Sequence, residues 1–261
     1  MCDRLRAYEV WVFFAAVLVV NAAFVAAIAS GTLPAGAYNL GRFLLLGLVL
    51  AAVVWSMRGR VGLVSVIRPL GRWRVGAGWF VLAMLWAPVL ALGLLAVRGL
   101  LLGHWPEDWM PGLGVLLRPG VALTVLVAAL VGEIVWVSYA IGRLSPRLGV
   151  LGASFVTGLV WTGWWLPMVW FGVGVIPDLP LGTLTLNMLG VAAMCGFLYA
   201  HTRSGVVVLV LQLMLNSALV VLPVTPFSGG TEVYAAFALT YLLAVLGLFF
   251  LCPPSGVVRA P

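Results

Sequence analysis

The sequence predicts an all-α fold: a polytopic membrane helix bundle of about eight transmembrane helices. The first observation is composition, since 64% of the 261 residues are hydrophobic and only 8% are charged, against roughly 25% charged in an average soluble domain. The second is a series of apolar stretches that reach or approach the roughly 20 residues needed to cross a bilayer. The third is that these stretches lack the polar–apolar alternation of a membrane β-barrel, so helices are expected.

Eight apolar stretches follow one another and leave no room for a separate soluble domain. The first three are poor in polar residues and, with the loop after them, form an expected helper unit over residues 1–118. The next four carry most of the intramembrane polar groups and form an expected core over residues 119–222. The last stretch belongs to the segment 223–261. In chain order the expected helices are Val10–Ser30, Leu40–Met57, Val75–Val97, Val121–Leu144, Leu148–Phe171, Gly182–Tyr199, Gly205–Leu222 and Val233–Cys252.

All 14 basic residues are arginine, and their distribution predicts the orientation of the chain. Counting the expected helices outward from the arginine-rich segment 58–74 places eleven arginines on one side of the membrane and three on the other. Because cytoplasmic loops are enriched in basic residues, we expect both termini and this segment to be cytoplasmic, in a plasma or inner membrane. We attribute the net charge of +7 to this orientation and expect no nucleic-acid partner. The segment's candidates for binding anionic lipid headgroups are Arg58, Arg60, Arg68, Arg72 and Arg74.

Glu133 is the only acidic residue deep inside an apolar stretch, the expected helix Val121–Leu144. An ionisable group at that depth is costly, so it is a functional-site hypothesis by default. The alternative is a structural role, in which the carboxyl group is hydrogen-bonded inside the bundle. Gln212 and Asn216 lie four residues apart and share a helix face, where such residues commonly link neighbouring helices.

Three spaced segments of the expected core carry a family resemblance. They are Glu133-Ile-Val-Trp-Val-Ser-Tyr-Ala-Ile-Gly-Arg-Leu144, then Gly158-Leu-Val-Trp-Thr-Gly-Trp-Trp165-Leu-Pro167-Met-Val-Trp-Phe171, and finally Phe197-Leu-Tyr199 followed by Gln212-Leu-Met-Leu-Asn216. Together they resemble the motifs of the CPBP intramembrane proteases, the family of CAAX proteases and bacteriocin-processing proteins. Those motifs read Glu-Glu, three residues, Arg; then Gly-Leu-x-Trp-x-x-Trp-His-Leu-Pro; then His-x-x-x-Asn. The resemblance covers about residues 119–222.

The departures from this pattern fall on the reactive groups of the family. The resemblance implies a glutamate as general base, with histidines that position water or stabilise the developing charge. Tryptophan offers a single N–H donor and glutamine does not titrate. Since catalytic groups that act as a unit fail as a unit, we predict that most catalysis is lost. The family's first Glu, its Arg and its two His fall on Gly132, Val137, Trp165 and Gln212, while Glu133 and Asn216 are retained.

We therefore interpret the chain as an integral membrane pseudoprotease that acts as a binding, scaffold or accessory protein. Its expected partners are the lipid bilayer and another membrane protein, a hydrophobic or lipidated peptide, or a lipid. One alternative is an active intramembrane endopeptidase that uses Glu133, and a weaker one is a small transporter or channel. No cofactor is expected. No metal is expected either, because His104 and His201 fall in expected loops on opposite sides of the membrane, and three ligands cannot be assembled.

One geometric expectation follows from the resemblance. Glu133, Trp165 and the helix face that carries Gln212 and Asn216 should converge, because motifs derived from one ancestral site should still meet in space.

Overall fold

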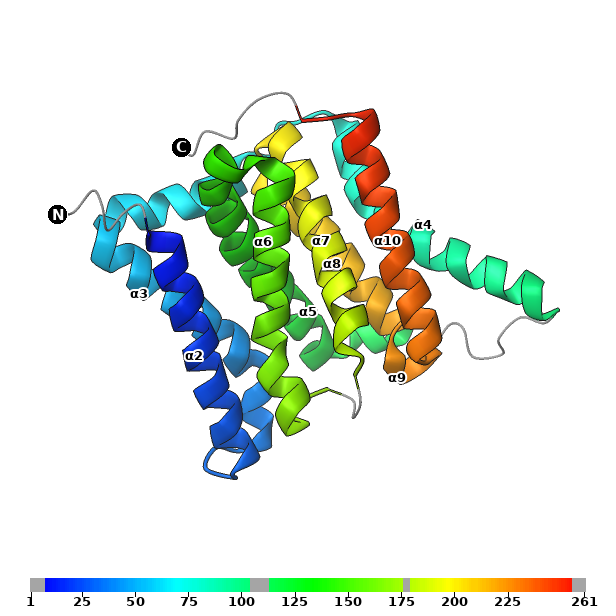
Figure 1. Ribbon diagram of the computed structural model, residues 1–261, viewed down its shortest axis with the longest axis horizontal. Helices are drawn as coiled ribbons and strands as arrows, with labels where there is room; N and C mark the ends of the chain where they lie inside the picture. Colours follow the sequence, from blue (N-terminus) through cyan, green and yellow to red (C-terminus); the bar gives the residue numbers. More distant parts are fainter. Residues whose placement is uncertain (1–7, 104–112, 176–178, 255–261) are drawn as a thin grey trace.

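The structure, a computed structural model, describes residues 8–103, 113–175 and 179–254. It confirms the predicted fold class, because these residues form a bundle of helices without a β-strand (Figure 1). Short helical turns are η1 (Ala35–Ala37), η2 (Arg68–Gly71), η3 (Leu113–Leu117) and α9 (Pro226–Gly229). The longer elements are α2 (Glu9–Ala29), α3 (Tyr38–Ile67), α4 (Ala77–Leu102), α5 (Pro119–Gly132), the π-helix η4 (Glu133–Ile141), α6 (Gly142–Phe171), α7 (Leu181–Thr202), α8 (Gly205–Val221) and α10 (Thr231–Leu251).

Seven helical segments in these ranges are long and apolar enough to cross a membrane. One of them runs over residues 119–171, which would extend for about 80 Å as a straight helix, far more than the roughly 30 Å hydrocarbon core. The chain turns inside this segment at Gly149, whose φ of 69° lies in the left-handed region that glycine adopts readily. Because the chain reverses at Gly149, residues 119–148 and 150–171 count as two passes, and the seven segments then give the eight passes that the sequence predicted. The predicted break at residues 145–147 is wrong, because these residues are helical and the chain turns at Gly149.

The alternation of the passes gives the bundle two ends. One end, which we call the basic end, lies at the top in Figure 1. It contains the start of α2, residues 58–74, the turn between α7 and α8, and the end of α10. The starts of α3, α5, α7 and α10 lie at the opposite end. Which membrane face each end meets stays a prediction.

The predicted end of the helix Leu40–Met57 agrees with a break in α3 at Gly59, where φ is 61°. A second helical stretch, which the sequence did not predict, follows the break and ends at Ile67. After the break the chain lies across the basic end of the bundle (Figure 1). Val61 and Ile67 on this stretch are exposed, whereas Val66 is buried against the bundle. Exposed apolar side chains next to arginines are typical of a segment that lies in the membrane interface.

The centre of the bundle is formed by α7 and η4. Helix α7 packs along α6 on one side and α10 on the other, and η4 contacts α3, α7 and α8. On the flank, α4 packs on α8. The buried face of α4 repeats alanine every fourth residue, at Ala83, Ala87 and Ala91. These small side chains allow close helix approach, as is common inside membranes.

Candidate functional site

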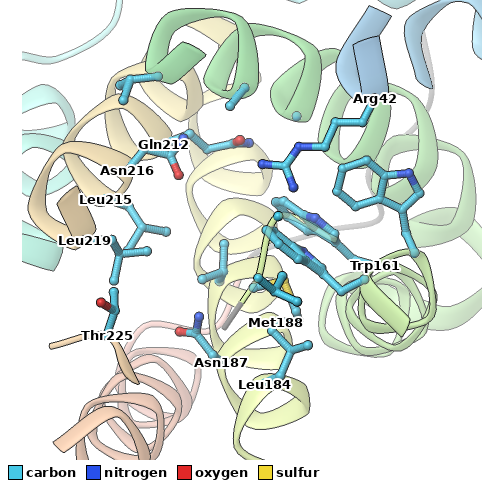
Figure 2. Close-up of a pocket in the computed structure, with 18 of the residues that line it drawn as sticks. Arg42, Trp161, Leu184, Asn187, Met188, Gln212, Leu215, Asn216, Leu219 and Thr225 are labelled. Atoms are coloured by element: carbon cyan, nitrogen blue, oxygen red, sulfur yellow. The ribbon is translucent and has the colours of Figure 1, made fainter. Parts of the chain in front are cut away.

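A cavity of about 470 Å³ lies between α3, α5, η4, α6, α7 and α8 (Figure 2). Its size is within the roughly 300–1,000 Å³ range of small-molecule sites. It extends from Gly132 and Trp136 in the middle of the bundle towards Phe227 of α9 at the opposite end. Most of its wall is apolar. The polar or charged side chains on the wall are Arg42, Thr124, Asn187, Gln212, Asn216, Thr225 and Tyr234.

Four tryptophans from η4 and α6 form one wall. Trp136 and Trp161 are stacked, with ring centroids 5.4 Å apart and an interplanar angle of 19°. Trp164 meets Trp136 edge-on at 6.4 Å and Trp165 at 5.7 Å. Because residues three and four apart share one face of a helix, the spacing of the three α6 tryptophans brings them to this wall together.

Four of the site residues predicted from the sequence meet at this cavity: Gly132, Trp165, Gln212 and Asn216 all line it. Figure 2 shows Gln212 and Asn216 side by side on α8. The amide nitrogen of Gln212 lies 3.8 Å from the Sγ of Cys195, to which it donates a hydrogen bond. A Cβ on Gly132 would overlap the amide oxygen Oε1 of Gln212. Asn187 adds a further amide, which donates to the hydroxyl of Tyr234 at 3.2 Å.

The carboxyl group of Glu133 lies apart from this set. Its side chain is fully buried and does not line the cavity. The hydroxyl of Ser138 donates to its Oε1 at 2.5 Å. Trp165, Gln212 and Asn216 therefore meet at the cavity, and the expected convergence of the Glu133 side chain with them stays a prediction.

The local winding of the chain explains this orientation. In an α-helix, residues five apart point in different directions, but η4 is a π-helix, whose i→i+5 bonding aligns Ser138 with Glu133. The carboxyl group also packs against the start of α8, since a Cβ on Gly205 would lie 2.6 Å from Oε1 and 3.1 Å from the backbone nitrogen of Leu70. A helix N-terminus favours a carboxylate. Glu133 thus packs between η4 and the start of α8, close to η2.

Residues 114–218 of the chain match the family described as type II CAAX prenyl endopeptidase, Rce1-like. Over these residues, which make up fewer than half of the chain, the sequence is similar to this family. The match begins in η3 and ends within α8, so it includes η4, the tryptophan wall and the Gln212/Asn216 face. It confirms the resemblance to CAAX proteases that the three motifs indicated. No curated protein matches the chain in a sequence comparison.

Within the Rce1-like core, the residue at the position of the family's arginine also does not line the cavity. Val137 is fully buried in the hydrophobic core and is absent from the cavity wall. Of the six predicted site residues, Glu133 and Val137 thus lie behind the wall, and the other four form part of it. Glu133, the acid of the motif that is retained, packs against Ser138 and the start of α8. Trp165 and Gln212, at the two histidine positions, line the cavity.

The basic segment next to the Rce1-like core divides into two groups. Arg58 pairs with the buried carboxylate of Glu9, so its charge is directed into the bundle, which corrects its assignment to lipid headgroups. The other four arginines of the set are exposed at the basic end, and one of them, Arg74, stacks on the ring of Trp73 at 5.1 Å. Headgroup binding stays a prediction for Arg60, Arg68, Arg72 and Arg74.

The predicted loop position of His201 is wrong. His201 lies in the last turn of α7, where its Nδ1 is 2.9 Å from the carbonyl oxygen of Phe197 and its ring packs on Trp79. His104 lies outside the described residues. In the ranges that are described, no group of three His, Cys, Asp or Glu side chains could hold a metal ion.

Sequence reasoning missed Arg42. This arginine was counted only as one of the three that oppose the orientation bias, yet its side chain lines the cavity and lies over four aromatic rings. Two signals were present in the sequence. Arg42 lies within an apolar stretch, and Tyr38 precedes it by four residues, the spacing at which side chains of a helix meet. The rings contributed by α6 could be found only from the tertiary structure.

Proposed function

We propose that this CAAX-protease-like membrane protein is a pseudoprotease that holds the hydrophobic chain of a ligand in its cavity and does not hydrolyse peptide bonds. The observation that carries the proposal is that the Glu133 side chain is not part of the cavity wall and accepts a hydrogen bond from Ser138 instead. The family's retained acid faces Ser138 and the start of α8, while Trp165 and Gln212 face the space where a substrate would lie.

Hydrolysis needs a base within hydrogen-bond reach of the attacking water, and donors aimed at the developing oxyanion. The titratable carboxyl group of Glu133 is enclosed by η4, η2 and α8. At the two histidine positions, the indole of Trp165 cannot accept a proton and the amide of Gln212 does not titrate. These groups support retention of a ligand, but they do not provide a base for water.

The remaining wall is suited to binding a hydrocarbon chain. Figure 2 shows Leu215 and Leu219 of α8 on one side of the cavity, Trp161 across from them, and Leu184 of α7 between the two sides. Burial of such a chain contributes roughly 0.8 kcal/mol per CH₂ group. A few polar side chains in a mostly apolar cavity are typical of a small-molecule site.

The first experiment measures cleavage. Purified protein in lipid nanodiscs is incubated with a fluorescence-quenched farnesylated CAAX peptide and with a transmembrane peptide, beside the Glu133→Gln variant. We expect the wild type and the variant to give the same background signal. Cleavage by the wild type that Glu133→Gln abolishes would overturn the proposal in favour of an active endopeptidase.

The second experiment measures binding. An amphiphile with a brominated alkyl chain should quench tryptophan fluorescence in a saturable way, because four tryptophans line the cavity. Ala128→Phe fills the cavity from α5 and should abolish the saturable component. Ala52→Phe is the matched control, because the same change is made on an exposed face of α3, and it should bind like the wild type. Equal binding by both variants would show that the ligand lies elsewhere.

A further inference from the structure

Arg42 enters the cavity from the first turns of α3. Its Nη1 donates to the hydroxyl of Tyr38 at 2.5 Å and lies 3.4 Å from the Sδ of Met168. Figure 2 shows the guanidinium group pointing into the cavity. The fold therefore places a permanent positive charge against a mostly apolar space.

The guanidinium lies over four aromatic rings. Its Cζ is 4.5 Å from the ring centroid of Phe43, 4.6 Å from that of Tyr38, 4.8 Å from that of Trp165 and 5.6 Å from that of Trp164. Such contacts stabilise a cation and hold it in one orientation. They do not neutralise its charge, and a charge inside a membrane bundle is normally paired.

No carboxylate in the described ranges contacts Arg42. The three acidic residues there are Glu9, which pairs with Arg58, Glu133, which accepts from Ser138, and Glu232 at the start of α10. The Nε of Arg42 and the indole Nε1 of Trp165 are both buried without a hydrogen-bond partner. Two unpaired donors and an unneutralised charge at one wall point to an anionic group that completes the site.

We propose that Arg42 binds the carboxylate or phosphate head group of a single-chain amphiphile, whose hydrocarbon chain occupies the cavity. The inference rests on the proposed function, and it adds the chemistry of the head group. Arginine suits this role, because its planar fork binds carboxylate and phosphate oxygens in pairs. The apolar wall of Leu184, Leu215 and Leu219 then receives the chain.

The alternative role for Arg42 is purely structural, as a cation that fastens α3 to α6 through the rings. The two roles differ in what they predict. A structural cation affects folding stability alone, whereas a head-group site makes the protein distinguish charged from neutral ligands. The test therefore measures ligand preference and stability separately.

The full-length protein in nanodiscs of neutral lipid is titrated with three brominated probes of equal chain length: a fatty acid, a lysophosphatidic acid and a neutral monoacylglycerol. We expect the two anionic probes to bind about tenfold or more tightly than the neutral one, as for a charge-assisted hydrogen bond. Arg42→Gln should remove this preference. Arg118→Gln, the same change at an exposed arginine before α5, should keep it.

Further measurements keep the test decisive if Arg42→Gln folds poorly. Arg42→Lys should bind the anionic probes with intermediate affinity, since it retains the charge but not the fork. Trp165→Phe keeps a ring under the guanidinium and removes the N–H donor, so it should reduce the preference for the anionic probes over the neutral one.

The outcomes separate the inference from the proposed function. Equal affinity of the wild type for anionic and neutral probes would overturn the inference and leave cavity binding intact. Absence of saturable binding by any probe would overturn both. Inorganic phosphate alone is tested as a competitor. Competition at concentrations similar to those of the anionic probes would indicate a site for a free anion and would overturn the proposal that the ligand is an amphiphile. Asp178 lies outside the described residues, so a double variant tests whether it pairs with Arg42. Strong non-additivity of Arg42→Gln and Asp178→Asn in thermal unfolding would reveal an internal ion pair. That result would also overturn the proposal.

Discussion

The side-chain amide of Gln212 occupies the space in front of Gly132. A Cβ on residue 132 would overlap Oε1 of Gln212, and its next neighbours would be other atoms of the same amide. These two positions are where the related proteases carry the first glutamate and the second histidine. The two departures are therefore coupled by packing, because the absence of a side chain at residue 132 makes room for the amide at residue 212.

This coupling predicts the behaviour of Gly132→Ala. The new methyl group displaces the amide of Gln212 from Cys195, and we expect a loss of about 1–3 kcal/mol in the free energy of unfolding, as for overpacked cores. Gln212→Ala removes the obstacle. The double variant should then lose less unfolding free energy than the two single variants lose together, by about 0.5–3 kcal/mol. Denaturant unfolding in detergent measures these losses.

Gly247→Ala is the control for the helix propensity of alanine. A Cβ at this position in α10 meets nothing within 4 Å, so the change should be neutral or stabilising by up to about 1 kcal/mol. Strict additivity of Gly132→Ala and Gln212→Ala would contradict the coupling.

Ser138 provides the hydrogen bond that holds the carboxyl group of Glu133 in η4. Its removal in Ser138→Ala leaves both oxygens without a partner, because Oε2 already has none. We expect a loss of about 1–3 kcal/mol in the free energy of unfolding. Glu133→Gln should cost less, since its amide oxygen still accepts from Ser138. Thermal unfolding of the two variants in detergent checks this order, and a Ser138→Ala protein as stable as the wild type would contradict it.

The structure identifies the hydrogen-bond partner of Glu133 that the sequence left open. Glu133→Leu would remove an acceptor. In the structure the hydroxyl that loses its acceptor is that of Ser138, while Gln212 bonds to Cys195. The sequence could not show this, because the predicted α-helix has no i→i+5 alignment, and the π-helical winding that creates it depends on packing by α3, α7 and α8.

The number and order of the helices could be predicted, because apolar length alone decides which segments cross a bilayer. The turn at Gly149 was misplaced, since Arg143, Pro146 and Arg147 have the composition of a loop. The chain nevertheless stays helical through them and turns where a glycine takes positive φ. Arg42 was missed because two of the rings around it, Trp164 and Trp165, come from a helix over 100 residues away in sequence.

The contact between Glu133 and Gly205 predicts that residue 205 must lack a side chain. In Gly205→Ala the new Cβ would lie 2.6 Å from Oε1 of Glu133 and 3.1 Å from the backbone nitrogen of Leu70. We expect a loss of about 1–3 kcal/mol from overpacking, together with faster proteolysis within residues 60–74 as η2 is pushed away from the bundle. Adding Glu133→Ala should restore part of the stability.

Gly182→Ala is the matched control for this variant. It also lies in the first turn of a helix, α7, but a Cβ there meets nothing within 4 Å, so proteolysis and stability should match the wild type. Equal effects of the Gly205 and Gly182 changes would show that Glu133 and η2 do not depend on close packing at α8.

The last prediction concerns orientation. The alternation of eight passes puts Gly71 at the basic end and Ser228 at the opposite end, and both residues are exposed. Single cysteines at these positions, in a background that lacks Cys2 and Cys252, should react with a membrane-impermeant maleimide from opposite sides. The arginine bias predicts that Gly71→Cys reacts only when the reagent has access to the cytoplasmic side of the membrane.

Two controls make this labelling decisive. Cys195 is buried, so the background protein should stay unlabelled in the folded state. Gly229 is a poor substitute for Ser228, because a Cβ there would overlap the carbonyl oxygen of Pro223. Labelling of both cysteines from one side would refute the eight-pass arrangement. The two cysteines could instead react from opposite sides with Ser228→Cys reached from the cytoplasm. The eight passes would then stand but the orientation would be reversed, because other determinants of insertion would have outweighed the arginine bias.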